Sequence, residues 1–400
     1  MLTLSHLKIL DLARWLLIGL SITILFSPFL SNVIEITLLG LFIFNQDLRA
    51  RFWNFKNQPL LLASGLFIFL LSLDCFYSVA PLKETLESLW GWRKILLLPL
   101  GLVLFNDVLW KNKFAYSLMT FVGIVSLFCM LFYLLELNVR GQEPGVLIRN
   151  HATQGMIFSA TLFLMGMILL FKKHMLPIRS LWILGFILPI LGALVYMTPG
   201  RSGYLAFMVV TIYFGYLLFR EKHYKILSLV LFLSSTLLLT SPLVRDRIEL
   251  GIKEMQHHAD SASIEANSIG DRMTIWKNTI ELIQDRPLLG FGTGSFEEAY
   301  SEKIKDNPEW EKQLKHDPHN QFLKIWAEMG MLGLMVFLSM LASSLFQKSS
   351  KMYFHLGIGV LLAWCATSLF NSHFSTFTEG RFIYIWLGIM LASESNKIKR

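Results

Sequence analysis

A histidine lies where polar loop sequence gives way to apolar sequence, and a glutamate lies further along the apolar segment. His319 and Asn320 close the polar half of KHDPHNQFLKIWAEMGMLGL, residues 315–334, and the second half is apolar at helical spacing. An imidazole at this boundary can accept a proton near neutral pH. The alternative is that His319 only caps the helix. About two turns further on, Glu328 is costly in lipid, so we expect it to face protein or a cavity as the partner of an arginine.

Four arginines lie next to apolar segments on the side of the chain that is otherwise poor in basic residues: Arg149, Arg201, Arg272 and Arg381. Arg201 is the clearest case, because Pro199 and Gly200 end one helix and Arg201 opens the next. A guanidinium at a helix N-terminus adds its donors to the free backbone N–H groups and to the helix dipole, which suits a phosphate or pyrophosphate. The alternative for each arginine is contact with lipid headgroups or pairing with a glutamate.

The composition indicates the class of fold that positions these residues. Hydrophobic residues make up 54% of the 400, and charged residues only 16%, against roughly a quarter in soluble domains. The apolar residues run in blocks about as long as a bilayer is thick. We therefore predict an all-α, polytopic membrane protein with about twelve spans. The spans are expected near 13–30, 32–46, 59–76, 94–109, 115–137, 153–171, 177–197, 203–219, 225–240, 321–346, 354–372 and 380–393.

Lysine and arginine concentrate in alternate loops, which predicts that those loops and both termini are cytoplasmic. The net charge of +8 is thus assigned to topology, and no nucleic-acid partner is expected. On the other side, one loop is long. We divide the chain into a membrane region 1–240, a loop 241–318 that covers the membrane face, and a membrane region 319–400. Within the loop, helices are expected around 272–284 and 297–305.

Two further patterns were weighed as sites. Gly290, Gly292 and Gly294 form a GxGxG run, but no strand precedes it and no P-loop lysine follows, so we predict a tight turn that docks the loop onto the membrane region. Four histidines share the long loop, yet Pro318 separates the closest pair and no metal motif is present. We expect neither a metal nor another cofactor. The histidines are His257, His258, His316 and His319.

Three segments together resemble a known family: RMTIWKNTIELIQDRPLLGFGTGSF, HNQFLKIWAEMGMLGL and NSHFSTFTEGRFIYIWLGI, preceded by TPGRSGYLAF. From about Thr198 to Ile389, the chain resembles the O-antigen ligase and polymerase superfamily of bacterial inner membranes. The resemblance implies a GT-C-like helical fold and places the family's essential histidine on His319 and its arginines on Arg201 and Arg272. One departure is Gly200, where the family often has Thr or Ser.

The resemblance implies a metal-independent, inverting glycosyltransferase that faces the periplasm. Its donor would be a polysaccharide on undecaprenyl pyrophosphate and its acceptor a sugar of lipid A-core. His319 would act as general base, and Arg201 and Arg272 would hold the pyrophosphate. Substrate-binding roles are expected for Asn320, Arg149, Arg381 and Glu328. Two alternatives stay open: a polymerase of the same superfamily, and a transporter of lipid-linked sugars.

Overall fold

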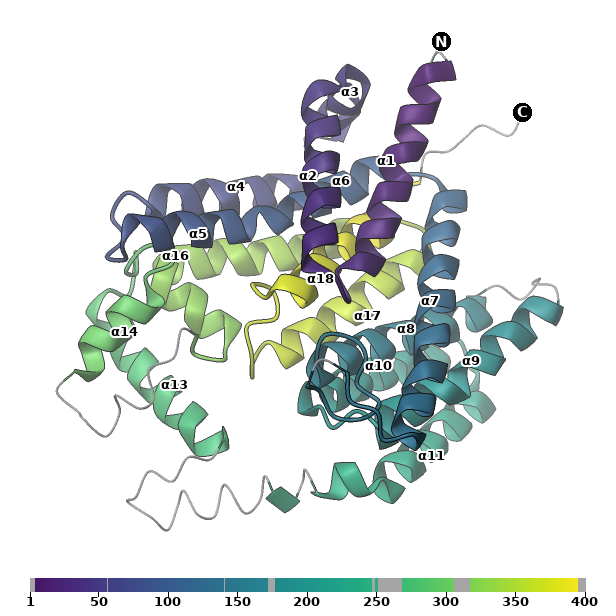
Figure 1. Ribbon diagram of the computed structural model, residues 1–400. Coiled ribbons are helices and arrows are strands. Elements are labelled where there is room, and N and C mark those ends of the chain that lie inside the picture. Colours follow the sequence, from purple (N-terminus) through teal and green to yellow (C-terminus); the bar gives the residue numbers. More distant parts are fainter. Residues whose placement is uncertain are drawn as a thin grey trace.

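The computed structural model describes residues 4–55, 57–139, 141–171, 177–246, 249–250, 268–305 and 317–394, and every regular element in these ranges is helical (Figure 1). The prediction of an all-α polytopic protein is confirmed. The helices are α1 Leu4–Thr23, α2 Pro28–Phe44, α3 Gln46–Phe55, α4 Pro59–Asp74, α5 Leu82–Trp92, the 3-10 turn η1 Arg93–Leu96, α6 Leu97–Leu104, α7 Val108–Leu134, α8 His151–Phe171, α9 Pro177–Tyr196, α10 Arg201–Arg220, α11 Tyr224–Thr240, α13 Ser268–Asp285, α14 Phe296–Ile304, α16 Gln321–Ser343, the 3-10 turn η2 Ser344–Phe346, α17 Lys351–Thr367 and α18 Phe377–Leu391.

Each apolar segment predicted to cross the membrane contains a helix, but the helices differ in length. Within the described residues, four are long and apolar enough to span a bilayer: α7, α8, α10 and the α16–η2 unit. The pair α2 and α3 passes the same test only as one span bent by 83°. At 8 residues, α6 is far shorter than the roughly 20 that a straight crossing needs. The number of twelve spans and the GT-C-like arrangement therefore stay predictions.

A close helix crossing brings together the two helices that begin at the candidate site. Where α8 crosses α10, a Cβ atom on Gly155 would lie 2.6 Å from the Cα atom of Gly203. Only glycine allows two helix backbones to approach so closely, which is how membrane helices commonly associate. The start of α8 is thereby fixed against the start of α10.

The helices of the long loop pack against α16. In Figure 1, α16 lies beside α4 and α5, with α13 and α14 at its flank. A small apolar cluster joins Ile275 and Leu282 of α13, Tyr300 of α14 and Ala327 of α16. The helices expected around 272–284 and 297–305 are confirmed as α13 and α14. Residues 251–267 and 306–316 of the loop lie outside the described residues.

Helix α16 is broken, and the glycine-rich segment fills the break. Gly330 has φ 65° and ψ −171°, so it interrupts the helix between its two halves. The freed groups of α16 pair instead with residues 287–292. Phe291 N–H donates to the Ala327 carbonyl at 3.0 Å, Gly292 N–H to Glu328 at 2.7 Å, and Met331 N–H donates to Pro287 at 2.9 Å. The prediction that this glycine turn docks the loop onto the membrane region is confirmed.

Candidate functional site

Asp317 organises the start of α16. Its Oδ1 accepts hydrogen bonds from the His319 backbone N–H at 2.8 Å and from the Ser372 hydroxyl at 2.6 Å, and its Oδ2 accepts one from Lys324 Nζ at 3.0 Å. Burial acts to raise the pKa of Asp317, but the Lys324 charge and these hydrogen bonds outweigh it, so the pKa lies below its usual value. The carboxylate is therefore charged at neutral pH and ties three segments together.

His319 is held in an unusual backbone conformation. Its φ is 52°, in the left-handed region, and the side chain is half-buried. Asn320 follows as the N-cap of α16: its Oδ1 accepts from the N–H groups of Phe322 at 3.0 Å and Leu323 at 3.1 Å. Its Nδ2 donates to the Leu369 carbonyl at 3.0 Å. Asn320 thus fixes the helix start, and the imidazole of His319 is the titratable group that this geometry presents.

The segment that carries His319 also holds α13. Trp276 Nε1 donates to the Pro318 carbonyl at 2.9 Å, and its ring lies 5.9 Å from that of Phe370. Arg272 lies one turn before Trp276 on the same helix and is half-buried. The structure therefore brings Arg272 and His319, which are 47 positions apart in the sequence, to adjoining segments.

A second histidine belongs to this site, and the sequence analysis did not single it out. His373 is 1% exposed, and its Nε2 lies 3.4 Å from the Ser202 hydroxyl on the first turn of α10. Burial lowers the pKa of His373, against the opposing charges of Glu379 and Asp317, and Arg272 lowers it further. His373 is therefore neutral at pH 7. The signal that could have found it is the one used for His319, a histidine in a short polar loop between apolar segments.

Arg201 opens α10 as predicted, and Gly200 is its N-cap. Gly200 has no side chain to accept a hydrogen bond from the first turn. A Cβ atom there would lie 2.8 Å from the backbone carbonyl oxygen of His151. A side chain at position 200 would therefore be crowded, because α8 begins directly against this position.

Arg149 lies just before α8 and is exposed, with φ 33°. Its guanidinium lies 5.2 Å from the centre of the Phe377 ring, at the start of α18. Nearby, the Thr153 hydroxyl donates to the Glu379 carboxylate, which joins α8 to α18. Arg149 thus stands at the same end of the bundle as Arg201 and the loop of His373.

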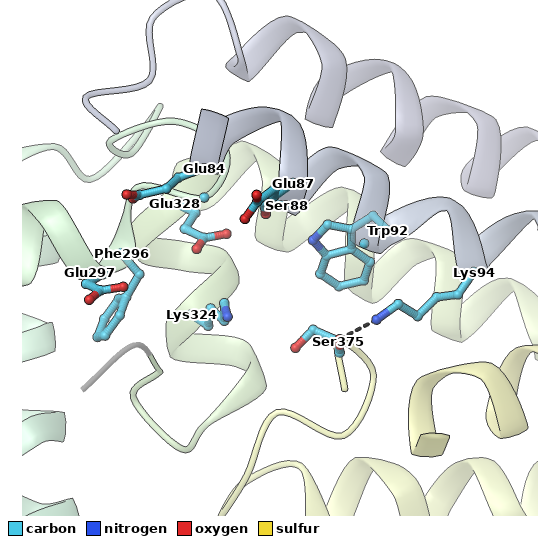
Figure 2. Close-up of a pocket in the computed structure, with 12 residues that line it drawn as sticks. Glu84, Glu87, Ser88, Trp92, Lys94, Phe296, Glu297, Lys324, Glu328 and Ser375 are labelled. Carbon is cyan, nitrogen blue, oxygen red and sulfur yellow. Dashed lines mark hydrogen bonds between the residues drawn. The ribbon is translucent and has the colours of Figure 1, made fainter. Parts of the chain in front are cut away.

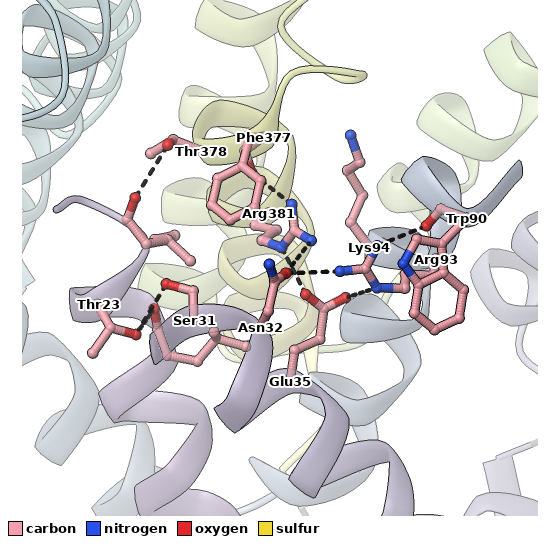
Figure 3. A network of polar contacts seen from close by, with 12 residues as sticks. Thr23, Ser31, Asn32, Glu35, Trp90, Arg93, Lys94, Phe377, Thr378 and Arg381 are labelled. Carbon is pink, nitrogen blue, oxygen red and sulfur yellow. Dashed lines mark hydrogen bonds and ion pairs between the residues drawn. The ribbon is translucent and has the colours of Figure 1, made fainter. Parts of the chain in front are cut away.

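Arg381 takes part in a buried ion network, shown in Figure 3. Its Nε donates to Glu35 of α2 at 2.7 Å, and Arg93 Nε lies 3.2 Å from the other oxygen of the same carboxylate. Asn32 accepts from Arg93 at 2.8 Å and from Arg381 at 3.4 Å. The glutamate pairing considered for Arg381 is therefore present, and a substrate contact by its guanidinium stays a prediction. Arg93, Glu35 and Asn32 are revealed only by the structure.

Glu328 faces a cavity, but its cationic neighbour is a lysine instead of the expected arginine. It is 3% exposed and lies one turn from Lys324 on α16. Its carboxylate accepts hydrogen bonds from the backbone of Gly294 and Phe296. Glu328 and Lys324 both line a cavity of about 290 Å³ between α5, α14 and α16 (Figure 2).

In the part of the chain that the structure describes, no group of three or more His, Cys, Asp or Glu side chains is arranged so that it could hold a metal ion. His257, His258 and His316 lie outside that part. The four-histidine pattern of the long loop is thus represented in the structure by His319 alone.

Part of the chain is similar to known proteins. Residues 186–338, which include Arg201, Arg272 and His319, match the sequence model of a family described as O-antigen ligase. The chain is 26% identical over 223 residues to an O-antigen ligase of Salmonella typhimurium, covering 55% of this chain and 52% of that protein. It is also 26% identical over 177 residues to an uncharacterized protein of Haemophilus influenzae, covering 40% of this chain and 42% of that protein.

The chain thus spans about half the length of the curated relatives it matches. The matched region runs from within α9 to within α16, so it contains both helix starts that carry Arg201 and His319. The resemblance inferred from the motifs is confirmed. Over residues 186–338, this multi-pass α-helical membrane protein is therefore similar to the O-antigen ligase family.

Proposed function

We propose that the protein transfers a glycan from a polyprenyl pyrophosphate to a sugar hydroxyl of lipid A-core at the periplasmic face of the bacterial inner membrane, with both termini in the cytoplasm. The observation that carries the proposal is the joining of three segments around His319. Asp317 and Pro318 contact Lys324, Ser372 and Trp276, and the loop of Ser372 reaches the start of α10 through His373.

Arg201 and Arg272 hold the pyrophosphate of the donor. The start of α10 offers backbone N–H groups without a side-chain cap from Gly200, together with the positive end of the helix dipole. Guanidinium groups add bidentate donors, which stabilise the negative charge that grows on the leaving pyrophosphate. Arg149, at the same end of the bundle, contributes positive charge at the entrance.

His319 takes the proton from the acceptor hydroxyl as the hydroxyl oxygen attacks the anomeric carbon. The bond from that carbon to the pyrophosphate oxygen breaks, and the pyrophosphate leaves with the electron pair. This single displacement inverts the anomeric centre. Because the donor is already activated and the arginines balance its charge, the reaction requires neither ATP nor a metal ion.

The first isoprene units of the donor's lipid chain enter an apolar cavity of about 190 Å³ between α8, α9, α10 and α11. Phe207, Val210 and Phe214 contribute to it from α10. Phe207 follows Arg201 by about 9 Å along the helix axis, at about 1.5 Å per residue. A pyrophosphate at Arg201 can therefore extend its prenyl chain along α10 into this cavity.

The test is lipopolysaccharide banding in a strain that lacks this protein, complemented with wild type or His319→Ala. We expect deletion and His319→Ala to leave only core-length lipid, with polymer accumulating on the carrier. A single repeat unit still attached to core, without the ladder, would identify a polymerase. Unattached glycan held at the cytoplasmic face would indicate a transporter.

A further inference from the structure

The cavity of about 290 Å³ shown in Figure 2 is not used by the donor in the function proposed above. It lies beside the first turns of α16 and is walled by α5 and by the start of α14. Its lining combines the indole of Trp92 with carboxyl groups that outnumber ammonium groups four to two: Glu84, Glu87, Glu297 and Glu328 against Lys94 and Lys324.

These side chains match the chemistry of an uncharged sugar. Carboxylates accept hydrogen bonds from neighbouring hydroxyl groups, and ammonium groups donate to ring and hydroxyl oxygens. The apolar face of a pyranose packs on an aromatic ring such as that of Trp92. The excess of carboxyl groups repels phosphate and uronate. The cavity therefore differs from the start of α10, where the charges favour an anion.

Two polar side chains of the cavity, Lys94 and Glu328, are fixed before any ligand binds. Lys94 is 3% exposed, and its ammonium donates to the backbone carbonyls of Ser375 and Thr376. Glu328 is held by the backbone at the start of α14. Glu84 and Glu87 lie on one face of α5, three positions apart, and are exposed at the cavity mouth. A site with fixed polar groups binds a sugar at a lower entropic cost.

The cavity is connected to the proposed base. Lys324 of its wall donates to Asp317, which accepts the backbone N–H of His319. Asp317 continues through Ser372 to the loop of His373, whose ring contacts Ser202 next to Arg201. This series of contacts runs from the cavity to the proposed pyrophosphate site. His319 is attached to it through Asp317.

We propose that this cavity binds the acceptor sugar, as an uncharged pyranose packed on Trp92 with its hydroxyl groups paired to the carboxylates. The proposal rests on the proposed function, since it assigns the second substrate of that reaction. The acceptor hydroxyl loses its proton to His319 as its oxygen bonds to the anomeric carbon, and the pyrophosphate departs toward Arg201. The acceptor then approaches His319 from the cavity, and the donor approaches it from the start of α10.

The experiment measures the KM for each substrate separately, using the purified full chain, a polyprenyl-pyrophosphate glycan and lipid A-core. Glu84→Gln and Glu87→Gln keep the side-chain shape and remove the charge. We expect each to raise the KM for lipid A-core about 5- to 10-fold, because a charge-assisted hydrogen bond is replaced by a weaker neutral one, with the donor KM unchanged within about twofold. Glu298→Gln is the matched control, because Glu298 is exposed on α14 outside the cavity lining.

Two further measurements sharpen the result. Trp92→Phe keeps an aromatic ring against Phe67, which lies 5.3 Å away, and is expected to raise the acceptor KM more than the donor KM. An acceptor with a phosphate on its terminal sugar should bind wild type more weakly than the unphosphorylated form. Glu84→Gln combined with Glu87→Gln should reduce that difference, because less negative charge then opposes the phosphate.

Other results would overturn the inference. A rise in donor KM with unchanged acceptor KM, or no change in either, removes the acceptor from this cavity while the proposed function stands. If wild type instead extends a second carrier-linked glycan, the acceptor class of the proposed function is wrong. The same KM comparison, with that glycan as the acceptor, then tests whether the acceptor binds in this cavity. Transfer to neither acceptor rejects the proposed function and this inference together.

Discussion

Helices α10 and α16 both begin at the candidate site, but their N-termini are capped differently. Asn320 caps α16 with a side chain that accepts two backbone N–H groups. Gly200 caps α10 without any side-chain hydrogen bond. The first N–H groups of a helix have no partner within the helix, so a cap decides whether they remain available to a ligand. The start of α16 is closed by its own side-chain cap, whereas the start of α10 has no side-chain cap from Gly200, which suits the proposed anion site.

The comparison separates two tasks. At α16, the cap and Asp317 hold His319 in the left-handed conformation, which suits a base that must be positioned. At α10, a guanidinium next to uncapped N–H groups suits charge stabilisation. Two other residues with positive φ, Glu136 and Lys222, follow α7 and α10 and form ordinary helix C-terminal caps. Arg149 and His319 instead precede helices, where such capping does not explain the conformation.

The largest effect is expected from His319→Ala. Removing the base should lower kcat by about 100-fold or more, while the protein still inserts and the donor still binds. The measurement is kcat with the purified protein. His223→Ala, at the far end of α10, is the matched control and should retain activity. Near-normal kcat in His319→Ala would show that His319 is not the general base and that the start of α16 has only a structural role.

The next effect is expected from Arg201→Lys. The positive charge remains, but a point charge cannot replace the bidentate fork, so kcat/KM for the donor should fall about 10- to 100-fold. The acceptor KM should hardly move. Full activity in Arg201→Lys would contradict the proposal that the pyrophosphate binds at the start of α10.

A smaller effect is expected at the cap of α16. Asn320→Ala loses the acceptor for two N–H groups, which should lower the free energy of unfolding by about 1 kcal/mol and reduce activity through His319. Asn320→Asp retains a capping oxygen and should keep more of both. Thermal unfolding and kcat of the two variants are compared. Equal loss in both would show that the cap is not what positions His319.

Gly200→Ser tests whether α10 tolerates a cap of its own. Relative to glycine, a serine hydroxyl would contribute only about a few tenths of a kcal/mol as a cap, but its Cβ atom meets the His151 carbonyl, and overpacking costs about 1–3 kcal/mol. We therefore expect a modest net loss of stability and weaker donor binding. A more stable variant with unchanged donor KM would show that the open start is not required.

The smallest effect concerns pH. The folded pKa of His373 is lowered, so the unfolded chain binds more protons below about pH 6.5, and stability is lost as pH falls from there through the folded pKa. The lowered pKa of Asp317 gives a second loss below about pH 4. Unfolding curves at several pH values measure both. His373→Asn should remove the first loss and leave the second.

Local sequence patterns predict which segments are helices and which residues lie at their starts. The apolar blocks, Pro199, Gly200 and the polar run before Gln321 placed Arg201 and His319 correctly, because helix boundaries follow from local patterns. The glycine turn was also predicted, since its signal lies within a few residues.

The connections between those helix starts depend on tertiary contacts. Arg381 pairs with Glu35 across 346 positions, and residues 287–292 complete the helix that Gly330 breaks. His373 and the cavity beside Trp92 likewise depend on contacts between distant segments. No local pattern encodes such contacts, because each arises from the packing of helices whose own sequences are compatible with many partners.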